Sequence, residues 1–267
     1  MLDKKILFLG GGNMAEGMLR GMIHTDTVAA DNIYVYDVFA QRVEYLNKEY
    51  GISQVREIKD GTDIADIILL AVRPQDFNTL AKQMSECRLE NKIVLSIIAG
   101  VSIEQMTQSI GDGIPVGRVM PNTMIEARCG YSGVTISDSF SDEQKEDVES
   151  LMNALGDTMF IPENLFDVFT AYSCAGPAYA YYFFAALVDA GVESGFSRQD
   201  SVKIAVESFL GAAIMVQKTG KHPYQITDTM TSPAGIGIAG LHVLSSSGFH
   251  GIIMDSVKAA LDKTKNF

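Results

Sequence analysis

The stretch Phe8-Leu9-Gly10-Gly11-Gly12-Asn13-Met14-Ala15 decides the fold of the first half of this 267-residue chain. A β-rich run, Ile6–Leu9, leads into it, and a segment with helical periodicity, Asn13–Ile23, follows it. A glycine-rich turn that joins a strand to a helix is typical of the first βα unit of a parallel α/β sheet. This context favours a nucleotide-binding turn over a turn that only reverses the chain.

Three small residues in this turn have the spacing G-x-G-x-x-A. Gly10 permits the tight turn, Gly12 lets the backbone approach a pyrophosphate, and Ala15 permits close packing of the helix. The first amides of the helix, at Asn13 and Met14, can bind the anion. The sequence therefore predicts a Rossmann domain that binds a nicotinamide dinucleotide through Gly10, Gly12, Asn13 and Met14.

The second β-rich run, Ile33–Tyr36, ends at an acidic residue, Asp37. A carboxylate at this place accepts hydrogen bonds from the adenosine ribose hydroxyls and repels a 2′-phosphate, which favours NAD(H) over NADP(H). Arg42, early in the next element, could instead attract such a phosphate. In an alternative interpretation, Asp37 only caps the helix that follows it.

Short β-rich runs alternate with helical patterns through the first part of the chain. Further runs are Ile67–Val72, Ile93–Ile97 and Val116–Val119, and further helical patterns are Phe39–Tyr50 and Asp76–Met84. Strands separated by helices predict right-handed crossovers and a parallel sheet. Two weaker runs, Gly133–Ile136 and Thr158–Ile161, flank a helix that Ser141 could cap, and could extend the sheet.

The pattern changes after Pro162, where no further strand is convincing and three or four helices follow. We therefore predict a Rossmann domain over residues 1–162 and an all-α domain over residues 163–267. Its longest helix is predicted over Ser197–Lys218, and the preceding segment, Pro177–Val188, is apolar on nearly every face. A small domain cannot cover such a helix alone, so we expect a partner subunit to cover it.

An uncharged stretch, Val168–Val188, has about the length of a membrane span. Gly176-Pro177 and three tyrosines within it favour a shorter, buried helix that begins at the proline, so we expect no membrane insertion.

A second turn, Ser232-Pro233-Ala234-Gly235-Ile236-Gly237, predicts the start of a helix with Ser232 as N-cap and Pro233 at the first position. Small residues leave the first amides uncovered, so a substrate carboxylate could bind there and to the Ser232 hydroxyl. A helix start without any ligand explains the same spacing.

Composition excludes several other functions. A formal net charge of −12 provides no basic face for nucleic acid. Three widely spaced cysteines (Cys87, Cys129 and Cys174) predict neither disulfides nor a metal site, and together with the missing signal peptide they favour a cytoplasmic location. The four scattered histidines and the absence of H-E-x-x-H and G-x-S-x-G motifs argue against hydrolases.

Motifs along almost the whole chain resemble those of the pyrroline-5-carboxylate reductase family. In the first half they are Phe8–Ala15, Ala71-Val72-Arg73-Pro74-Gln75, Ser96–Val101 and Arg118–Thr123. In the second half they are Ala175–Tyr179, Asp189–Val192, His222-Pro223, Thr231–Leu241 and Gly248-Phe249. The chain therefore resembles this family in the order of its motifs as well as in the motifs themselves.

The resemblance implies NAD(P)H-dependent reduction of 1-pyrroline-5-carboxylate to L-proline, with a helical domain that forms homodimers and often larger rings of dimers. It implies that the nicotinamide half of the cofactor lies against Ala71, Val72, Arg73, Pro74, Ala99, Gly100 and Asn122. It also implies that Ser232, Gly235, Ile236 and Gly237 bind the carboxylate of the imino acid.

Three departures from the family pattern leave other functions open. Ala234 and Gly237 stand where the family has glycine and threonine, Ala175 replaces a serine, and Met124–Gly130 differs from the usual segment after Thr123. Two hydroxyls expected near the substrate are thereby lost, so a related cyclic imino acid or keto acid is an alternative substrate.

A dinucleotide sensor without catalysis is a further alternative. A hydroxyacid dehydrogenase of the 6-phosphogluconate type is disfavoured, because no lysine occurs between Gly176 and Gly195.

Overall fold

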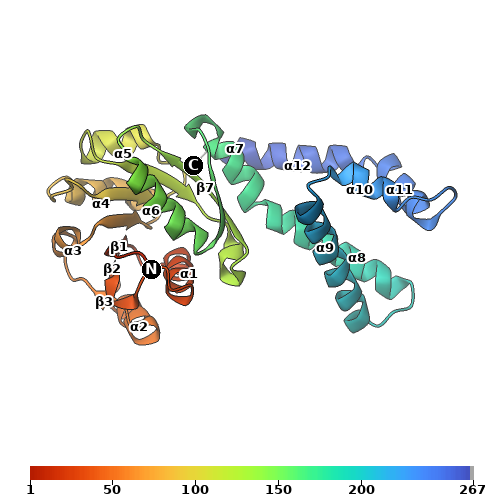
Figure 1. Ribbon diagram of the computed structural model, residues 1–267, viewed down its shortest axis with the longest axis horizontal. Coiled ribbons are helices and arrows are strands. Elements are labelled where there is room, and N and C mark those ends of the chain that lie inside the picture. The colour runs from red at the N-terminus through yellow and green to blue at the C-terminus, as the bar shows by residue number, and fades with distance from the viewer. Residues whose placement is uncertain (265–267) are drawn as a thin grey trace. The chain divides into compact units, whose positions relative to one another are not determined.

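The computed structural model describes residues 1–264. Strands and helices alternate in its first part (Figure 1). The strands are β1 (Ile6–Leu9), β2 (Ile33–Tyr36), β3 (Ser53–Gln54), β4 (Ile67–Leu70), β5 (Ile93–Ser96), β6 (Val116–Met120), β7 (Gly130–Ile136) and β8 (Gly156–Phe160). The helices are α1 (Asn13–His24), α2 (Ala40–Tyr50), α3 (Ile58–Ile64), α4 (Phe77–Met84), α5 (Ile103–Ile110), α6 (Asp142–Asn153) and α7 (Phe166–Phe169). Short 3₁₀ turns are η1 (Ala30–Asn32), η2 (Pro74–Asp76), η3 (Thr123–Ala127) and η4 (Glu163–Leu165), and η5 (Thr170–Cys174) is a π-helical turn.

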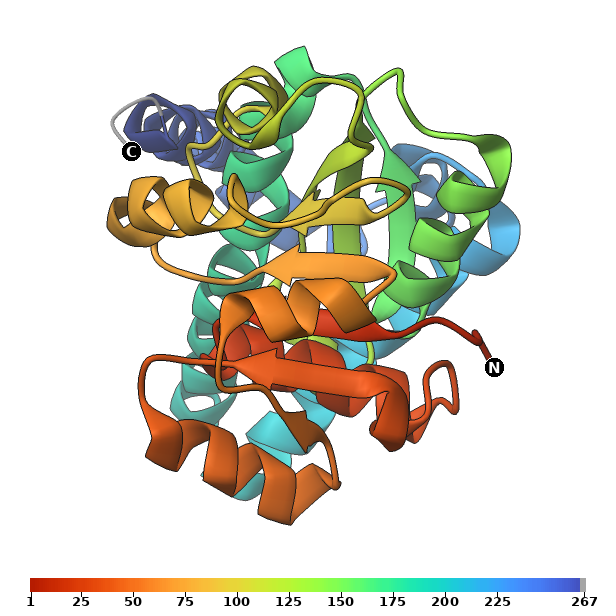
Figure 2. The same cartoon turned by 90° about the vertical axis from the view of Figure 1, so that its left-hand side faces the viewer.

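The eight strands form one sheet in the order β3-β2-β1-β4-β5-β6-β7-β8. Ile6 of β1 pairs with Ile33 of β2 on one side and with Ile67 of β4 on the other, both in parallel. Strand order reverses at β1, and α/β proteins bind ligands at the carboxyl ends of the strands at such a switch point. Figure 2 shows the red and orange β1, α1, β2 and α2 together at one side of the sheet.

The Rossmann prediction is confirmed, with one correction to the sheet. β7 and β8 extend it as expected, but β7 runs antiparallel to β6, so the sheet is not wholly parallel. The link from Pro121 to Cys129 is too short for the crossover that a parallel neighbour needs. Sequence periodicity also missed β3, α3 and α5, which have 2, 7 and 8 residues.

Helices cover both faces of the sheet. Apolar residues of α1, α2 and α6 pack on one face, among them Met18, Leu46 and Leu151, which are fully buried. Residues of α3, α4 and α5 pack on the other face, among them Leu80 and Met106. The strands between these layers are apolar on both faces, as β1 and β4 are along their whole length.

The chain divides into two compact units. The first unit contains residues up to Cys174 and the described residues from Leu261 onward, and the second contains Ala175–Ala260. This division comes later than the predicted boundary after Pro162. The physical reason is that residues 163–174 pack on the sheet unit, where Phe166 is 1% exposed and Ala171 is 3% exposed.

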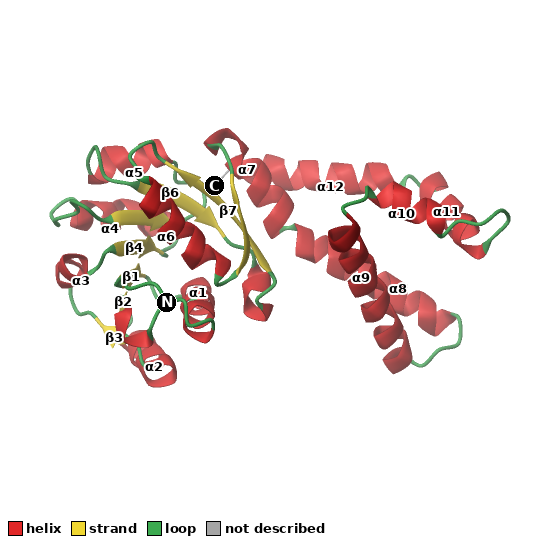
Figure 3. Ribbon diagram, viewed as in Figure 1, coloured by secondary structure: helices red, strands yellow, loops and turns green. Residues whose placement is uncertain are grey.

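The second unit contains only helices among its described residues (Figure 3). They are α8 (Gly176–Glu193), α9 (Arg198–Thr219), α10 (Pro223–Thr229), α11 (Ile236–Ser246) and α12 (Phe249–Thr264). The Phe183 ring of α8 contacts Phe209 of α9 and Phe249 of α12, with centroids 5.6 and 5.5 Å apart. The unit has more helices than the three or four expected, because α10 and α11 are short and separated by the Ser232 turn.

The prediction that one chain cannot cover α8 is confirmed. Val188 is its one buried residue among those described, whereas Tyr181 and Tyr182 are 62% and 83% exposed. Exposed apolar side chains continue along α9, α11 and α12. A surface of this kind marks an interaction site in a folded protein.

Within residues 1–264, no single helix has both the length and the apolar composition of a membrane span. The pair α11 and α12, bent by 50° at its junction, satisfies both criteria when the two helices are taken together.

Candidate active site

The glycine-rich turn lies between β1 and α1, at the carboxyl edge of the sheet. Gly10 has a φ of +108°, which favours glycine, and its N–H donates to the Tyr36 carbonyl oxygen at 2.8 Å. A Cβ at Gly10 would lie 2.5 Å from the Ala71 carbonyl oxygen. Any side chain here would therefore separate β1 from the end of β4.

The start of α1 fits a dinucleotide pyrophosphate. Gly12 is its N-cap, and no side chain among the described residues caps the first amides, including those of Asn13 and Met14. A Cβ added at Gly12 would meet no described atom within 4 Å. The backbone is therefore open where an anion must approach it, and the helix dipole favours negative charge there.

Asp37 lies directly beside this turn. Its Oδ2 accepts a hydrogen bond from Gly11 N–H at 2.7 Å, and its Oδ1 accepts one from Phe39 N–H at 2.9 Å. A carboxylate can accept about four hydrogen bonds, so capacity for two ribose hydroxyls remains. The alternative that Asp37 caps the next helix is wrong, because the N-cap of α2 is Phe39.

Arg42 bonds to the carbonyl oxygen of Gly11 and is not a free cation. Its Nε donates to the Gly11 carbonyl oxygen at 2.5 Å, and its Nη2 pairs with Oε2 of Glu16. The second oxygen of Glu16 accepts from the hydroxyls of Tyr50 at 2.8 Å and Tyr45 at 3.1 Å. Burial raises the pKa of Glu16, but the hydrogen bonds from Arg42, Tyr50 and Tyr45 outweigh burial and lower that pKa below its ordinary value.

Residues predicted for the nicotinamide half follow the ends of neighbouring strands. Ala71 and Val72 follow β4 and are half-buried, whereas Arg73 is exposed and its Nε donates to Asp76 at 2.9 Å. Pro74 begins η2, and the segment Ala99-Gly100 follows β5, with a φ of +76° at Gly100. Parallel strands bring these residues to the same sheet edge as the glycine-rich turn.

Asn122 follows β6 and is 7% exposed. Its Oδ1 accepts from the N–H groups of Met124 and Tyr131, and its Nδ2 lies 3.5 Å from both the carbonyl and the hydroxyl oxygen of Ser173. The side chain thus links η3, β7 and η5. Its contact with a nicotinamide stays a prediction.

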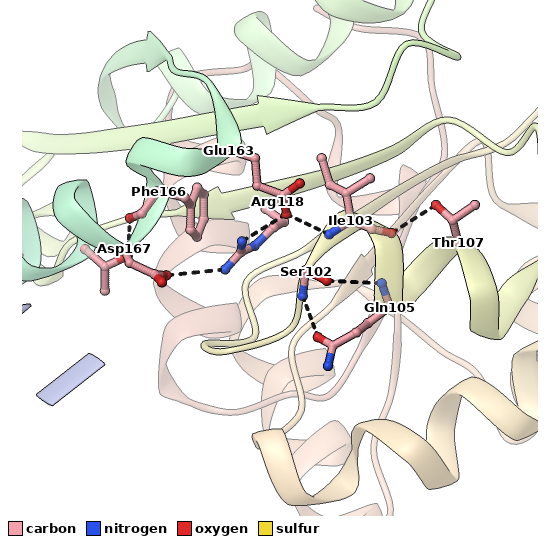
Figure 4. A network of polar contacts seen from close by, with 9 residues as sticks. Ser102, Ile103, Gln105, Thr107, Arg118, Glu163, Phe166 and Asp167 are labelled. Carbon is pink, nitrogen blue, oxygen red and sulfur yellow. Dashed lines mark hydrogen bonds and ion pairs between the residues drawn. The ribbon is translucent and has the colours of Figure 1, made fainter. Parts of the chain in front are cut away.

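Arg118 of β6 is a buried cation that sequence reasoning did not assign (Figure 4). Its Nη1 donates to Oε1 of Glu163 at 3.1 Å, its Nη2 lies 3.9 Å from Asp167, and its guanidinium lies 3.9 Å from the centroid of the Phe166 ring. The same Glu163 oxygen accepts from the N–H of Ile103 at 2.8 Å. Arg118 therefore holds the segment after β8 against the sheet and against the start of α5.

The Ser232 turn lies in the second unit and differs from its prediction. α11 begins at Ile236 with Gly235 as N-cap, so the prediction of Ser232 as N-cap and Pro233 as first helical residue is wrong. Ala234 has a φ of +56°, which breaks the helical path before Gly235. No side chain in the described part of the chain caps the first amides of α11. The open amides are therefore three residues later than expected.

The two glycines of this turn each prevent a collision. A Cβ at Gly235 would lie 2.5 Å from the Ser232 hydroxyl oxygen, and a Cβ at Gly237 would lie 2.9 Å from the Met230 carbonyl oxygen. Ile236, between them, is 96% exposed. The backbone at Gly237 is thus packed in a way that leaves no room for a side chain.

Other candidate sites carry no predicted residue. A cavity of about 750 Å³ is lined by residues of β7, β8 and α6, among others, and none of the site residues predicted from the sequence lines it. No group of three or more His, Cys, Asp or Glu side chains within residues 1–264 could hold a metal ion. Cys87, Cys129 and Cys174 are free thiols.

Comparisons with known proteins match both halves of the chain. Residues 163–267 match the family described as pyrroline-5-carboxylate reductase dimerisation, and residues 5–100 match NADP oxidoreductase, coenzyme F420-dependent. A pyrroline-5-carboxylate reductase of Synechocystis is 33% identical, covering 96% of each chain. Pyrroline-5-carboxylate reductase 1 of Bacillus subtilis is 32% identical, covering 98% of this chain and 89% of the relative.

The chain belongs to the pyrroline-5-carboxylate reductase family. Solved structures of the family agree over the whole length. The pyrroline-5-carboxylate reductase of Coxiella burnetii has a TM-score of 0.91 at 26% identity, covering 99% of this chain and 98% of that chain. The enzyme of Plasmodium falciparum, solved with NADP bound, has a TM-score of 0.88 at 28% identity, covering 100% and 98% of the two chains.

Within this member of the family, sequence reasoning found the turn and Asp37 but missed Glu16 and Arg118. A single arginine inside the otherwise uncharged strand Val116–Met120 was the available signal for Arg118. Glu16 had no such signal, because a carboxylate in the first turn of a helix is ordinary on its own. Its partners come from α2, which the sequence could not place beside it.

Proposed function

We propose that this chain reduces 1-pyrroline-5-carboxylate to L-proline with a reduced nicotinamide dinucleotide. The observation that supports this most strongly is the open N-terminus of α1 beside Asp37, in a chain of this family. The reduced nicotinamide, when bound, supplies the hydride to the carbon of the C=N bond.

The chain's own residues have mainly a positioning role in this proposal. A protonated imine is already electrophilic, so the protein needs to hold the two reactants in the correct geometry. Gly12, Asn13 and Met14 would bind the pyrophosphate through backbone amides and the helix dipole, and Gly10, whose N–H donates to Tyr36, would shape the turn beside it. Ala71–Pro74 and Ala99-Gly100 would lie against the nicotinamide half.

We infer that the first amides of α11 bind the substrate carboxylate. Ile236 and Gly237 present uncapped backbone amides at the positive end of a helix of 11 residues, whereas the Gly235 N–H already donates to the Ser232 carbonyl oxygen at 2.9 Å. Ser232 stands next to Gly235 and could donate its hydroxyl to the same anion. We expect Ser232→Ala to raise KM for the imino acid by about tenfold or more and to change kcat less, since a hydrogen bond to a charged acceptor is worth about 1.5 to 3 kcal/mol.

NADH is proposed as the preferred cofactor. Asp37 offers acceptors to ribose hydroxyls and repels a 2′-phosphate, and the nearby cation Arg42 is already paired. We expect Asp37→Ser to weaken NADH binding by about tenfold or more, because hydrogen bonds to a charged acceptor are worth about 1.5 to 3 kcal/mol. The match to an NADP-dependent family and the NADP-bound relative leave NADPH as the alternative outcome.

The helical unit is proposed to form a homodimer, and dimers could assemble into larger rings. The match to the family's dimerisation domain and the exposed apolar faces of α8 and α9 support this. The cytoplasmic location and the absence of nucleic-acid and membrane partners stay predictions from the sequence.

Steady-state rates with NADH and NADPH across five-membered and six-membered cyclic imino acids test the proposed activity. We expect the highest kcat/KM for 1-pyrroline-5-carboxylate with NADH. Tight binding of NADH without turnover of any imine would instead support the dinucleotide-sensing alternative.

A related cyclic imino acid is the second candidate substrate. The close approach of the Met230 carbonyl oxygen to Gly237 favours it, because this turn has no room for the threonine of the family pattern. Faster turnover of a six-membered than of the five-membered imino acid would establish this alternative. Gly237→Thr is a poor test, since its Cβ would displace the Met230 carbonyl.

A further inference from the structure

Glu16 is the centre of a polar cluster that neither the predicted site nor the proposed reaction uses. It lies in the first turn of α1, and its partners Arg42, Tyr45 and Tyr50 all belong to α2. Three donors from one helix converge on one carboxylate of another helix, next to the proposed site of the adenosine ribose.

We propose that Glu16 determines cofactor choice by holding Arg42 away from a 2′-phosphate. The inference rests on the proposed binding of the adenosine ribose at Asp37.

Arg42 is the cation bonded to the same glycine as Asp37. Gly11 donates its backbone N–H to Asp37, and its carbonyl oxygen accepts the Nε–H of Arg42. The carboxylate and the guanidinium therefore flank the same glycine. An unpaired arginine in this place would bind phosphate well, because its planar fork matches phosphate oxygens.

Glu16 prevents Arg42 from binding a phosphate in two ways. Its carboxylate neutralises the charge of Arg42, and its ion pair fixes the position of Nη2. The side chains of Arg42 and Glu16 are only 25% and 15% exposed, so water screens this pair weakly. A 2′-phosphate would have to break the pair and would also face the charge of Asp37.

The tyrosines fix Glu16 in turn. Tyr50 and Tyr45 donate to its second oxygen, so both oxygens of the carboxylate are engaged. Burial and the hydrogen bond to Glu16 raise the pKa of Tyr50 to about 12, so its hydroxyl stays a donor at neutral pH. The Tyr45 ring also lies against the Arg42 guanidinium, 5.2 Å from ring centroid to Cζ.

Calorimetric titration of NADH and NADPH into the full-length protein, without substrate, tests the proposal. We expect Glu16→Gln to tighten NADPH binding by about tenfold, the worth of one charge-assisted hydrogen bond, and to change NADH binding by less than about twofold. Glu44→Gln removes the same charge from an exposed position of α2 and should change neither affinity.

Two further variants separate release of Arg42 from a general charge effect. Glu16→Asp keeps the charge but is too short to hold Arg42, so we expect it also to tighten NADPH binding, by at least about threefold. In the double variant Glu16→Gln/Arg42→Met, the gain in NADPH affinity that Glu16→Gln alone produces should be lost.

An unchanged NADPH affinity in both Glu16 variants would overturn the proposal, and so would a gain that persists without Arg42. Circular dichroism of each variant identifies any that fails to fold, and Glu16→Asp is the milder change. Wild-type protein that binds NADPH more tightly than NADH would contradict the proposed cofactor, whereas the variants measure the role of Glu16 separately.

Discussion

Charged side chains around the glycine-rich turn bond to backbone and to each other before any ligand binds. Asp37 accepts from the amides of Gly11 and Phe39, and Arg42 donates to the Gly11 carbonyl oxygen. Groups held in this way lose little conformational freedom when a cofactor arrives. At the residue scale, the site is therefore preorganised by contacts between α1, β2 and α2.

Glu16 should make stability depend on pH in the acid range. Its pKa is lowered in the folded protein, so the unfolded chain binds the proton first, and stability falls as the pH falls. The contribution is complete above the ordinary value of 4.5 and is lost as the pH falls through the lowered folded-state value. Urea midpoints measured from pH 7 down to the acid range should fall more steeply for the wild type than for Glu16→Gln. Parallel curves for the two proteins would contradict this account of Glu16.

Ala234 should cost stability in its left-handed conformation. With a φ of +56°, it carries a penalty of about 1 kcal/mol that glycine avoids, partly offset by the greater freedom of glycine in the unfolded chain. We expect Ala234→Gly to raise the free energy of unfolding by about 0.5 kcal/mol, measured by urea unfolding at fixed protein concentration.

Ala239→Gly, inside α11, is the matched control for this change. The same substitution in a helix interior should lower the free energy of unfolding by about 1 kcal/mol. Loss of stability in both variants would mean that the Ala234 conformation carries no strain.

At the scale of elements, the segment 163–174 is anchored to the sheet at both ends. Arg118 holds Glu163 and Phe166, and Asn122 contacts Ser173. The buried guanidinium would be costly without partners, and Glu163 and Asp167 pair with its two Nη atoms, whereas its Nε has no hydrogen-bond partner among the described residues. This explains why the compact unit extends to Cys174 and not only to Pro162.

Glu163 should matter more to stability than its neighbour Asp167. Glu163 bonds to both Arg118 and the Ile103 amide, so Glu163→Ala should cost about 2 to 3 kcal/mol by leaving a buried charge poorly paired. Asp167 lies 3.9 Å from Arg118 and is more than half exposed, so Asp167→Ala should cost less than about 1 kcal/mol. Thermal unfolding measures the stability of the two variants, and an equal loss of stability in both would argue against Glu163 as the main anchor.

The sequence predicted elements well where a pattern was long and local. The runs Ile6–Leu9 and Ile33–Tyr36 match β1 and β2, and Ser141 caps α6 as expected. The helix predicted over Ser197–Lys218 corresponds to α9, with Ser197 as its N-cap. The prediction that α11 begins at Pro233 was wrong. Ser-Pro fits a helix N-terminus locally, but the left-handed conformation of Ala234 overrides that preference. The pairing of Glu16 with Arg42 depends on how α1 and α2 pack, which no local pattern encodes.

At the scale of the whole molecule, the chain combines a sheet unit that has a buried core with a helical unit whose apolar faces are exposed to solvent. The sheet has buried clusters on both faces, whereas α8, α9, α11 and α12 expose many large apolar side chains. A second copy of the chain is the cover that the family's dimerisation domain indicates.

A charge on the exposed face of α9 should prevent this association. Leu210 is 52% exposed in a single chain, so Leu210→Glu should leave the fold intact but place an unpaired charge in the proposed interface. We expect light scattering after gel filtration to give a monomer mass for this variant. Ile64→Glu, at a 40% exposed position of α3, should keep the mass of the wild type. An unchanged mass for Leu210→Glu would exclude this face of α9 from the interface.

The measurement that tests the proposed function most directly follows the transferred hydrogen. The purified protein is incubated with 1-pyrroline-5-carboxylate and NADH deuterated at the reactive C4 position of the nicotinamide, and the product is analysed by mass spectrometry and NMR. The proposed reaction predicts L-proline with one deuterium at C5, formed faster with NADH than with equally labelled NADPH. The absence of deuterated proline with either cofactor would contradict it.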